Sequence, residues 1–470
     1  MKRRVFIQNL FLASGGLVLA GQPGYAAVVK KKKAIRGRVT AQGKKLADVS
    51  VSDGFAVVRT DRKGRYELPA HPQARFVFVS IPAGYHFPNE KGLARHYHSL
   101  AGDTARSFDF ELSPLETDDA RHQFIIWADP QVKNAADVQL MMQQSVPDVQ
   151  QLVQGLGAGT LIHGIGVGDL VWDNHALFPK YSEAVSAMGI PFFQALGNHD
   201  MDYRQGGDDT SDSTFQKNFG PTYYSFNRGK VHYVVLDDVR YLGREREYDG
   251  HISQQQLGWL KEDLRFVPQD HLVILNAHIP VARVKNRADL YALLQGYQVH
   301  IMTGHTHYNQ NVIQEGIYEH IHGTVCGAWW TGPVCSDGAP SGYGVYEVDG
   351  NQLSWHYKST GLDASHQVSV HVETLTNQHR LIANVWNWDP AWKVEWWADE
   401  SYMGTLTNSK GMDPTAVALY KGTKLPARRP FAEPSRTDHL FVGHFKPGVK
   451  KVRIVATDRF GKKYEQLKEL

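Results

Sequence analysis

Cysteine is scarce in this sequence, with only Cys326 and Cys335 among 470 residues. Two cysteines alone supply too few ligands for a structural zinc site, which needs about four. Because the two lie close together in the chain, they predict a disulfide that closes a short loop if the protein is exported. The alternative is a pair of buried free thiols.

The chain also lacks an excess of charge. Its 51 Lys and Arg exceed its 48 Asp and Glu by three, and three basic residues (Lys2, Arg3 and Arg4) lie within the first 27. Without that segment the chain is nearly neutral. This balance argues against duplex nucleic acid or an anionic membrane as a partner.

The N-terminus lacks an apolar run long enough to span a bilayer. Residues 10–20 are apolar, but the stretch is short and contains glycines. A basic start, this stretch and small residues up to Ala27 predict a cleaved signal peptide over residues 1–27, and no transmembrane anchor in the mature chain. The Arg3-Arg4 pair is similar to a twin-arginine signal, which predicts export to a bacterial periplasm or cell envelope. Export by the general pathway stays open, because no Ser or Thr precedes the pair.

What the sequence does contain is one pattern repeated five times, a short apolar run that ends at a potential metal ligand. The ends read Asp129-Pro130-Gln131, Gly168-Asp169, Gly197-Asn198-His199-Asp200, Asn276-Ala277-His278 and Gly304-His305-Thr306-His307. Short apolar runs separated by helical patterns predict strands of a sheet that is covered on both faces. Ligands at the ends of such strands would meet at one rim.

The residue types suit two divalent metals held side by side. A carboxylate such as Asp169 has two oxygens and a charge and can bridge two cations, whereas an imidazole or amide binds one. Each motif alone would be ordinary turn chemistry. His305 and His307, two residues apart, can point the same way only if the backbone bends, and we expect Gly304 to allow that bend.

The order and spacing of these motifs resemble the calcineurin-like metallophosphoesterases, whose pattern is D-x-H, G-D, G-N-H-[DE], H and G-H-x-H. The resemblance covers about residues 122–325. It implies an α/β two-sheet sandwich that hydrolyses phosphate esters with two divalent ions, such as Mn, Fe or Zn. One ion would be held by Asp129, Asp169 and His307, with Gln131 as a further candidate, and the other by Asp169, Asn198, His278 and His305.

The same resemblance implies roles for two further residues. His199, beside the ligand Asn198, would protonate the leaving oxygen, and Asp200 would orient His199. Two positions depart from the family pattern. Gln131 stands where most members have His, so it is either a neutral oxygen ligand or one bridged by water. Trp172 stands where purple acid phosphatases carry a Tyr ligand, so no tyrosinate-bound ferric iron is expected.

The rest of the chain is predicted to form flanking β domains. Short strands separated by Asp-Gly turns indicate an N-terminal β-sandwich over residues 34–113, similar to the carboxypeptidase-regulatory type. The core is predicted at residues 122–345 and a C-terminal β-rich domain at 346–470. Within the core, helices are expected over residues 135–155, divided at Pro147, over residues 174–189, and over residues 253–264, with Ser253 as the N-cap.

A Gly-rich loop after the last motif carries three candidate substrate contacts, Trp329, Trp330 and Asp337. The alternative is that the tryptophans cover the seam between core and C-terminal domain. The predicted substrate is a small-molecule or glycan-linked phosphate mono- or diester. The competing function is a metal-dependent binding or adhesion protein without turnover, and the presence of both His199 and Asp200 favours the enzyme.

Overall fold

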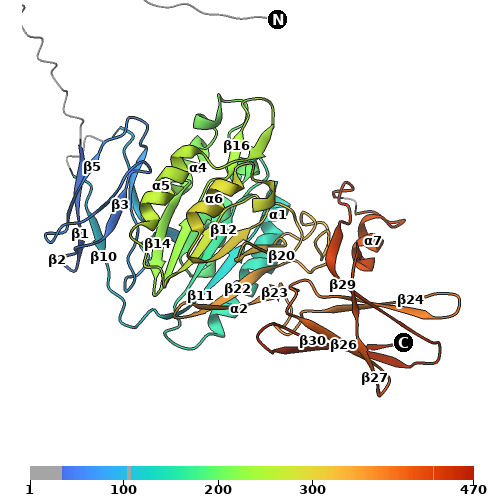
Figure 1. Cartoon of the computed structure of the whole chain (residues 1–470). Coiled ribbons are helices and arrows are strands. Elements are labelled where there is room, and N and C mark those ends of the chain that lie inside the picture. Colours follow the sequence, from blue (N-terminus) through green and yellow to red (C-terminus); the bar gives the residue numbers. More distant parts are fainter. Residues whose placement is uncertain (1–33, 103–106, 427) are drawn as a thin grey trace, which may run out of the picture. The chain divides into compact units, whose positions relative to one another are not determined.

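The computed structural model describes residues 34–102, 107–426 and 428–470 (Figure 1). The predicted signal peptide lies outside these residues. Ala34–Leu470 form one compact unit. Within the described part, no helix combines the length and apolar character needed to cross a membrane.

The N-terminal region is a sandwich of two four-stranded sheets. One contains β1 (Ala34–Ala41), β2 (Lys44–Lys45), β5 (Arg65–Pro69) and β10 (Phe110–Leu112), and the other contains β3 (Ser50–Ser52), β4 (Val57–Arg59), β6 (Phe76–Val79) and β9 (Tyr97–Ser99). Between β6 and β9 the chain leaves the sandwich. There β7 (Asn89–Glu90) and β8 (Leu93–Ala94) join the edge of a core sheet, where Leu93 pairs with Phe192.

The core consists of two larger sheets, as the fold-class prediction required. The first has seven strands in the order β23-β22-β11-β12-β13-β8-β7, with β11 (Arg121–Trp127), β12 (Ile162–Val167), β13 (Phe192–Ala195), β22 (Gly342–Asp349) and β23 (Gln352–Ser359). The second has six in the order β14-β15-β18-β19-β21-β20, with β14 (Tyr224–Arg228), β15 (Val231–Val235), β18 (Leu272–Asn276), β19 (Gln298–Thr303), β20 (Gln310–Gln314) and β21 (Ile317–Ile321). The predicted boundary at residue 345 falls inside β22, and the domain limits remain a prediction.

Two runs of parallel strands set the position of the motifs. β11, β12 and β13 are parallel to one another, and so are β15, β18, β19 and β21. Apolar residues of both sheets, such as Ile126, Ile165, Val273 and Ile301, are fully buried in one cluster. Because parallel strands end at the same edge of a sheet, the motifs that follow β11, β12, β13, β18 and β19 lie on one rim.

Helices cover the core sheets, and most begin and end close to the predicted residues. The predicted helix over 135–155 consists of α1 (Ala135–Leu140), a π-helical turn (Met141–Ser145) and α2 (Val146–Gln154). Pro147 does not end the helix. It lies in the first turn of α2, and because it has no N–H to donate, the turn before it is widened.

The other predicted helices are present. The second begins with a 3₁₀ turn (His175–Leu177), continues as α3 (Phe178–Met188) and ends at Gly189 with φ +75°. The Ser253 side chain caps α5 (Gln254–Leu264) by accepting a hydrogen bond from the backbone N–H of Gln256. The remaining core elements are α4 (Ser213–Phe219), α6 (Arg287–Leu294), the hairpin of β16 (Val239–Tyr241) and β17 (Tyr248–Gly250), and three 3₁₀ turns (Asn198–Asp200, Asp208–Thr210 and Val281–Arg283).

The C-terminal region is β-rich, as expected. Its two four-stranded sheets are β24-β25-β29-β28 and β27-β26-β30-β31. The strands are β24 (Ser369–Thr374), β25 (His379–Asn384), β26 (Lys393–Ala398), β27 (Ser401–Thr405), β28 (Thr407–Met412), β29 (Arg436–Phe445), β30 (Lys451–Thr457) and β31 (Lys463–Glu469). Its one helix among the described residues is α7 (Pro414–Tyr420), which the side chain of Asp413 caps. The segment between α7 and β29 returns to the core.

Candidate metal centre

The structure brings the predicted ligands together from the two core sheets. The loops after β11, β12 and β13 supply the carboxylates and amides of Asp129, Gln131, Asp169 and Asn198. The loops after β18 and β19 supply the imidazoles of His278, His305 and His307. The backbone N–H of His305 donates to both oxygens of Asp129, at 3.1 and 2.9 Å, and this ties the two sets of loops to each other.

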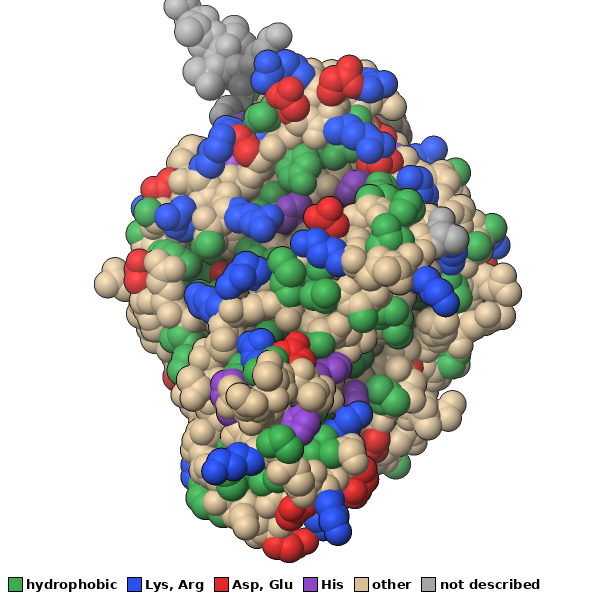
Figure 2. Space-filling view, turned by 90° about the vertical axis from the view of Figure 1, so that its right-hand side faces the viewer, with side chains coloured by type: hydrophobic (Ala, Val, Ile, Leu, Met, Phe, Trp, Pro, Cys, Tyr) green, Lys and Arg blue, Asp and Glu red, His purple; other side chains and the backbone are tan. Residues whose placement is uncertain are grey.

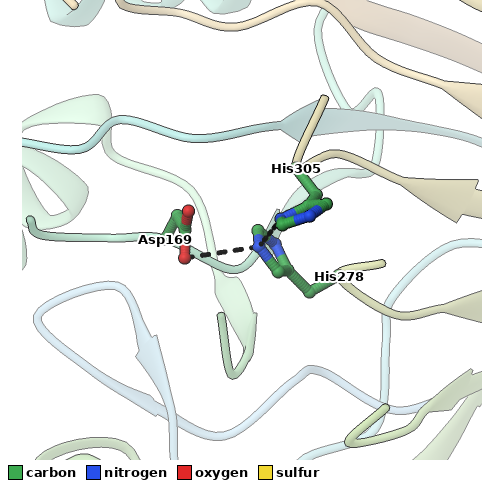
Figure 3. Close-up of side chains that lie close together, drawn as sticks. All are labelled: Asp169, His278 and His305. Atoms are coloured by element: carbon green, nitrogen blue, oxygen red, sulfur yellow. Dashed lines mark hydrogen bonds and ion pairs between the residues drawn. The ribbon is translucent and has the colours of Figure 1, made fainter. Parts of the chain in front are cut away.

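The tightest group surrounds Nε2 of His278, which lies 3.0 Å from Oδ1 of Asn198, 3.1 Å from Nδ1 of His305 and 3.3 Å from Oδ1 of Asp169. Figure 3 shows Asp169, His278 and His305 directed at one another. The other ring nitrogen of His278, Nδ1, donates to the carbonyl of Val167 at 2.9 Å. In the neutral ring, Nε2 therefore presents a lone pair to atoms that also present lone pairs.

Such a convergence needs a positive charge among the atoms, either a proton on Nε2 of His278 or a cation, so these residues fit a metal ion. The electrostatics agree. Burial lowers the pKa of His278, but the carboxylates of Asp169 and Asp129 outweigh burial and raise it to about 10, which shows how strongly this point attracts positive charge. Burial and His278 lower the pKa of His305 to about 3, so its imidazole is neutral, the form that binds metals.

Asp169 faces a second, looser group of candidate ligands. Its Oδ1 belongs to the group around His278, whereas Oδ2 accepts a hydrogen bond from Nε2 of Gln131 at 2.7 Å. On the same side, Nε2 of His307 lies 3.5 Å from Oδ1 of Asp129. Oε1 of Gln131 and Nδ1 of His307 are buried without a hydrogen-bond partner, so this side too has unsatisfied lone pairs.

The backbone at the ligands is strained. Five of the seven predicted ligands have left-handed backbone angles, namely Asp129 (φ +49°), Gln131 (+40°), Asp169 (+53°), His305 (+68°) and His307 (+58°). Each such residue costs about 1 kcal/mol or more relative to ordinary backbone. The surrounding fold has to impose these angles, and they aim consecutive side chains into one site.

Glycines in the motifs allow the close approach of neighbouring loops. A Cβ on Gly197 would lie 2.0 Å from the backbone nitrogen of Asp169, and one on Gly304 would lie 2.4 Å from Oδ2 of Asp129. The prediction that Gly304 makes the bend between His305 and His307 is wrong. The two histidines adopt the left-handed angles themselves, and Gly304 is needed because it touches Asp129.

His199 lies at the edge of this centre, but its partner differs from the prediction. Its backbone N–H donates to Oδ1 of Asp169 at 2.8 Å, and its Nδ1 lies 2.9 Å from Oδ1 of Asp173. Asp173 is also paired with Arg246. The prediction that Asp200 orients His199 is wrong, because Asp173 makes that contact. The sequence signal that could have identified this partner of His199 is the carboxylate of Asp173, four residues after Asp169.

Asp200 instead joins two of the ligand loops. It is fully buried, and its oxygens accept the backbone N–H groups of Leu170, Val171 and Gly197 at 3.1, 3.1 and 3.0 Å. These bonds hold the loop after β12 against the loop after β13. Asp200 therefore supports the position of Asp169 and Asn198 through the backbone.

The three predicted substrate contacts separate in the structure. Trp329 is partly exposed, and its ring lies 4.7 Å from that of His307. Trp330 is buried and donates from Nε1 to the carbonyl of Pro130 at 2.8 Å, so it anchors the loop to the ligand loop after β11. Asp337 is fully buried, where it accepts the N–H of Asn309 at 2.6 Å and lies 3.1 Å from Nε2 of His439. Asp337 is therefore not accessible to substrate.

The predicted disulfide is also wrong. Cys326 and Cys335 are free thiols, and both are buried. Each is directed at Thr324: the Cys326 thiol donates to its hydroxyl at 3.3 Å and the Cys335 thiol to its carbonyl at 3.7 Å. Burial raises the pKa of Cys326 to about 12, so the group stays protonated.

Comparison with known proteins agrees with this geometry. Three family models match consecutive parts of the chain: the N-terminal part of calcineurin-like phosphoesterases matches residues 33–115, the phosphoesterase itself 136–309, and the C-terminal part 319–464. The chain belongs to the calcineurin-like phosphoesterases. It is accordingly a metal-dependent phosphoric ester hydrolase.

Solved structures similar to this phosphoesterase include a dimetal phosphatase from Danio rerio, with 14% identity and a TM-score of 0.38 over 51% of this chain and 97% of that one. A purple acid phosphatase from yellow lupin seeds has 14% identity and a TM-score of 0.40 over 67% of each chain. No curated protein matches this phosphoesterase.

Proposed function

We propose that this phosphoesterase is exported and hydrolyses phosphate mono- or diesters with two divalent ions. The observation that carries the proposal is the convergence of Asp169 Oδ1, Asn198 Oδ1 and His305 Nδ1 on Nε2 of His278. These four residues would hold one ion. Asp129, His307 and Asp169 would hold the other, with Gln131 as an additional oxygen donor.

Two bound ions would lower the pKa of a water between them towards about 7 and stabilise charge on the phosphoryl oxygens. The chain itself supplies the remaining roles. Asp169 directs one oxygen to each half of the site, and His199 extends from the rim with Nδ1 held by Asp173. With Nδ1 occupied, Nε2 of His199 is the atom that would give a proton to the leaving oxygen.

The test is hydrolysis of p-nitrophenyl phosphate and bis(p-nitrophenyl) phosphate by the purified protein with Mn²⁺, Fe²⁺ or Zn²⁺, together with elemental analysis. We expect close to two metal equivalents per chain and turnover of at least one ester. Two bound metals without turnover of any mono- or diester would support a metal-dependent binding protein instead. The pairing of His199 with Asp173 favours the enzyme, because a binding protein has no need of an oriented proton donor.

Export is the second part of the proposal. It is supported by the basic and apolar layout of residues 1–27 and by the Arg3-Arg4 pair. Expression of the full chain in a bacterial host, followed by fractionation and mass measurement of the mature protein, tests it. We expect a periplasmic product cleaved near Ala27, and substitution of both arginines by lysine should block its export by the twin-arginine route.

A further inference from the structure

The C-terminal region contributes an aromatic side chain to the surroundings of the metal centre. Phe431 lies between α7 and β29, far in sequence from all the ligand motifs. Its ring centroid lies 5.3 Å from that of Trp329 and 5.7 Å from that of Trp172. The two tryptophan rings are 6.1 Å apart. Three segments distant in sequence thus form one aromatic cluster of Trp172, Trp329 and Phe431.

This aromatic cluster adjoins both halves of the metal centre. Trp172 contacts His199 with a centroid distance of 5.6 Å, and Trp329 contacts His307 at 4.7 Å. On the face shown in Figure 2, histidine side chains lie among basic and hydrophobic side chains around a hollow in the upper half of the view. A group attached to a phosphate bound at the metals would extend past these rings.

Phe431 is not needed to hold its own segment in place. Arg429, which is 5% exposed, pairs with Asp137 at 2.5 Å, and Ala432, 1% exposed, packs in a small core with Ala416 and Tyr420. These contacts fix the chain on both sides of Phe431. Phe431 as a whole is nevertheless 52% exposed.

Phe431 is the most exposed residue of the aromatic cluster, and Trp329 is half-buried. Trp172 is half-buried as well, but two cations already lie over its ring, with Lys133 Nζ 4.4 Å and the Arg429 guanidinium 5.3 Å from the ring centre. Phe431 meets Trp172 at 89° and Trp329 at 62°, so the rings form an open corner and do not stack flat on one another. A corner of this kind can receive a further flat ring, which would bury apolar surface that now faces water.

We propose that Phe431 and Trp329 form a subsite for a planar ring on the ester, such as an aryl group or a nucleobase, and that Phe431 determines this specificity. The proposal rests on the proposed phosphoesterase function and narrows its substrates to esters with a flat organic group. It also gives the C-terminal region a part in substrate selection.

The test compares the binding of two ligands that cannot be hydrolysed, phenylphosphonate and methylphosphonate, to the Mn²⁺-loaded protein by calorimetry. For the unchanged protein we expect the phenyl compound to bind several-fold more tightly. Phe431→Ala should raise its Kd about 5- to 10-fold, the usual scale for one aromatic contact, and change the Kd of methylphosphonate less than 2-fold. Phe431→Tyr should restore the preference.

Phe460→Ala is the matched control. Phe460 is another phenyl ring of the C-terminal region, 45% exposed, and its ring contacts Trp355 and not the aromatic cluster. This variant should bind both phosphonates like the unchanged protein. Equal loss of both ligands in Phe431→Ala, or no phenyl preference in the unchanged protein, would overturn the proposal.

Aryl phosphate hydrolysis is measured in parallel and separates the two proposals. Phenyl preference that depends on Phe431, without hydrolysis of any ester, would refute the phosphoesterase proposal and leave the ring subsite standing. Hydrolysis of an ester by a protein whose phenyl preference does not depend on Phe431 would support the phosphoesterase proposal and refute the ring subsite.

Discussion

At the scale of single residues, His199 contacts the metal centre but belongs to neither group of candidate ligands. Its backbone is bonded to Asp169 and its ring to Asp173, so the ring has a fixed direction. We expect His199→Ala to lower kcat by about 10²- to 10⁴-fold, the range for loss of a general acid, while the metal content stays near two equivalents. Elemental analysis beside steady-state kinetics measures both. Loss of metal in this variant would show that the ring is a ligand.

Asp169 faces both groups of candidate ligands. Its two oxygens lie 3.3 Å from Nε2 of His278 and 2.7 Å from Nε2 of Gln131. Asp169→Ala is therefore expected to remove most of both metals together with activity. Asn198→Ala, which removes a neutral side chain proposed to bind one ion only, is the control and should retain part of the metal. Two tightly bound equivalents in Asp169→Ala would contradict a bridging role.

At the scale of elements, Asp200 bonds to the backbone of the loops after β12 and β13, whereas the carboxylate of Asp173 contacts the side chains of His199 and Arg246. Asp200→Ala leaves three buried backbone N–H groups without their acceptor, and each such loss costs about 1–3 kcal/mol. We expect this variant to melt at a lower temperature and to bind metal more weakly. The measurements are differential scanning calorimetry and metal titration.

Asp173→Asn provides the contrast within the same pair of loops. The amide keeps the size of the side chain but removes the charge that faces His199, so turnover should fall by about 10-fold or more. The melting temperature and metal content should stay close to those of the unchanged protein, because Asp173 is not bonded to the backbone of the loop after β13 by its side chain. If Asp200→Ala and Asp173→Asn behave alike, the two carboxylates do not have separate roles.

At the scale of the whole molecule, several histidines are buried in neutral form. Burial lowers the pKa of His96 and His300 to about 3 and that of His122 and His322 to about 4. In the unfolded chain these groups have a pKa near 6.5. As the pH falls below 6.5, the unfolded chain takes up protons that the folded protein does not. The stability they contribute is therefore present above pH 6.5 and is lost as the pH falls towards 4.

His122 offers a single-site test of this acid sensitivity. Its Nε2 lies 2.7 Å from the hydroxyl of Tyr233 and its Nδ1 3.0 Å from the carbonyl of Asp119, while Arg228 adds to the lowering of its pKa. Between pH 7.5 and 5 this one group should cost about 2 kcal/mol of unfolding free energy. His122→Gln, which keeps hydrogen-bonding atoms but cannot titrate, should make the pH profile of urea unfolding shallower by that amount. An unchanged slope would show that His122 takes up its proton in the folded state.

Much of the site was predictable from the sequence, because ligands at the ends of parallel strands need only local information. A short apolar run followed by Asp, Asn or His specifies both a strand and what stands at its end, as at Asp169 and His278. Through its resemblance to the calcineurin-like metallophosphoesterases, the order of such motifs implied the two-sheet fold and the candidate ligands that the structure brings together. The helices followed in the same way from spacing and caps, as at Ser253.

Only the tertiary structure decided which side chains meet across loops. Asp200 is next to His199 in sequence, yet its carboxylate bonds to the backbone of two loops, whereas Asp173, 26 residues away, contacts the imidazole. Cys326 and Cys335 are near in sequence yet face Thr324, and Phe431 reaches Trp329 from a distant segment with no motif of its own. Such contacts depend on backbone angles and on the packing of separate regions, and neither leaves a local pattern in the sequence.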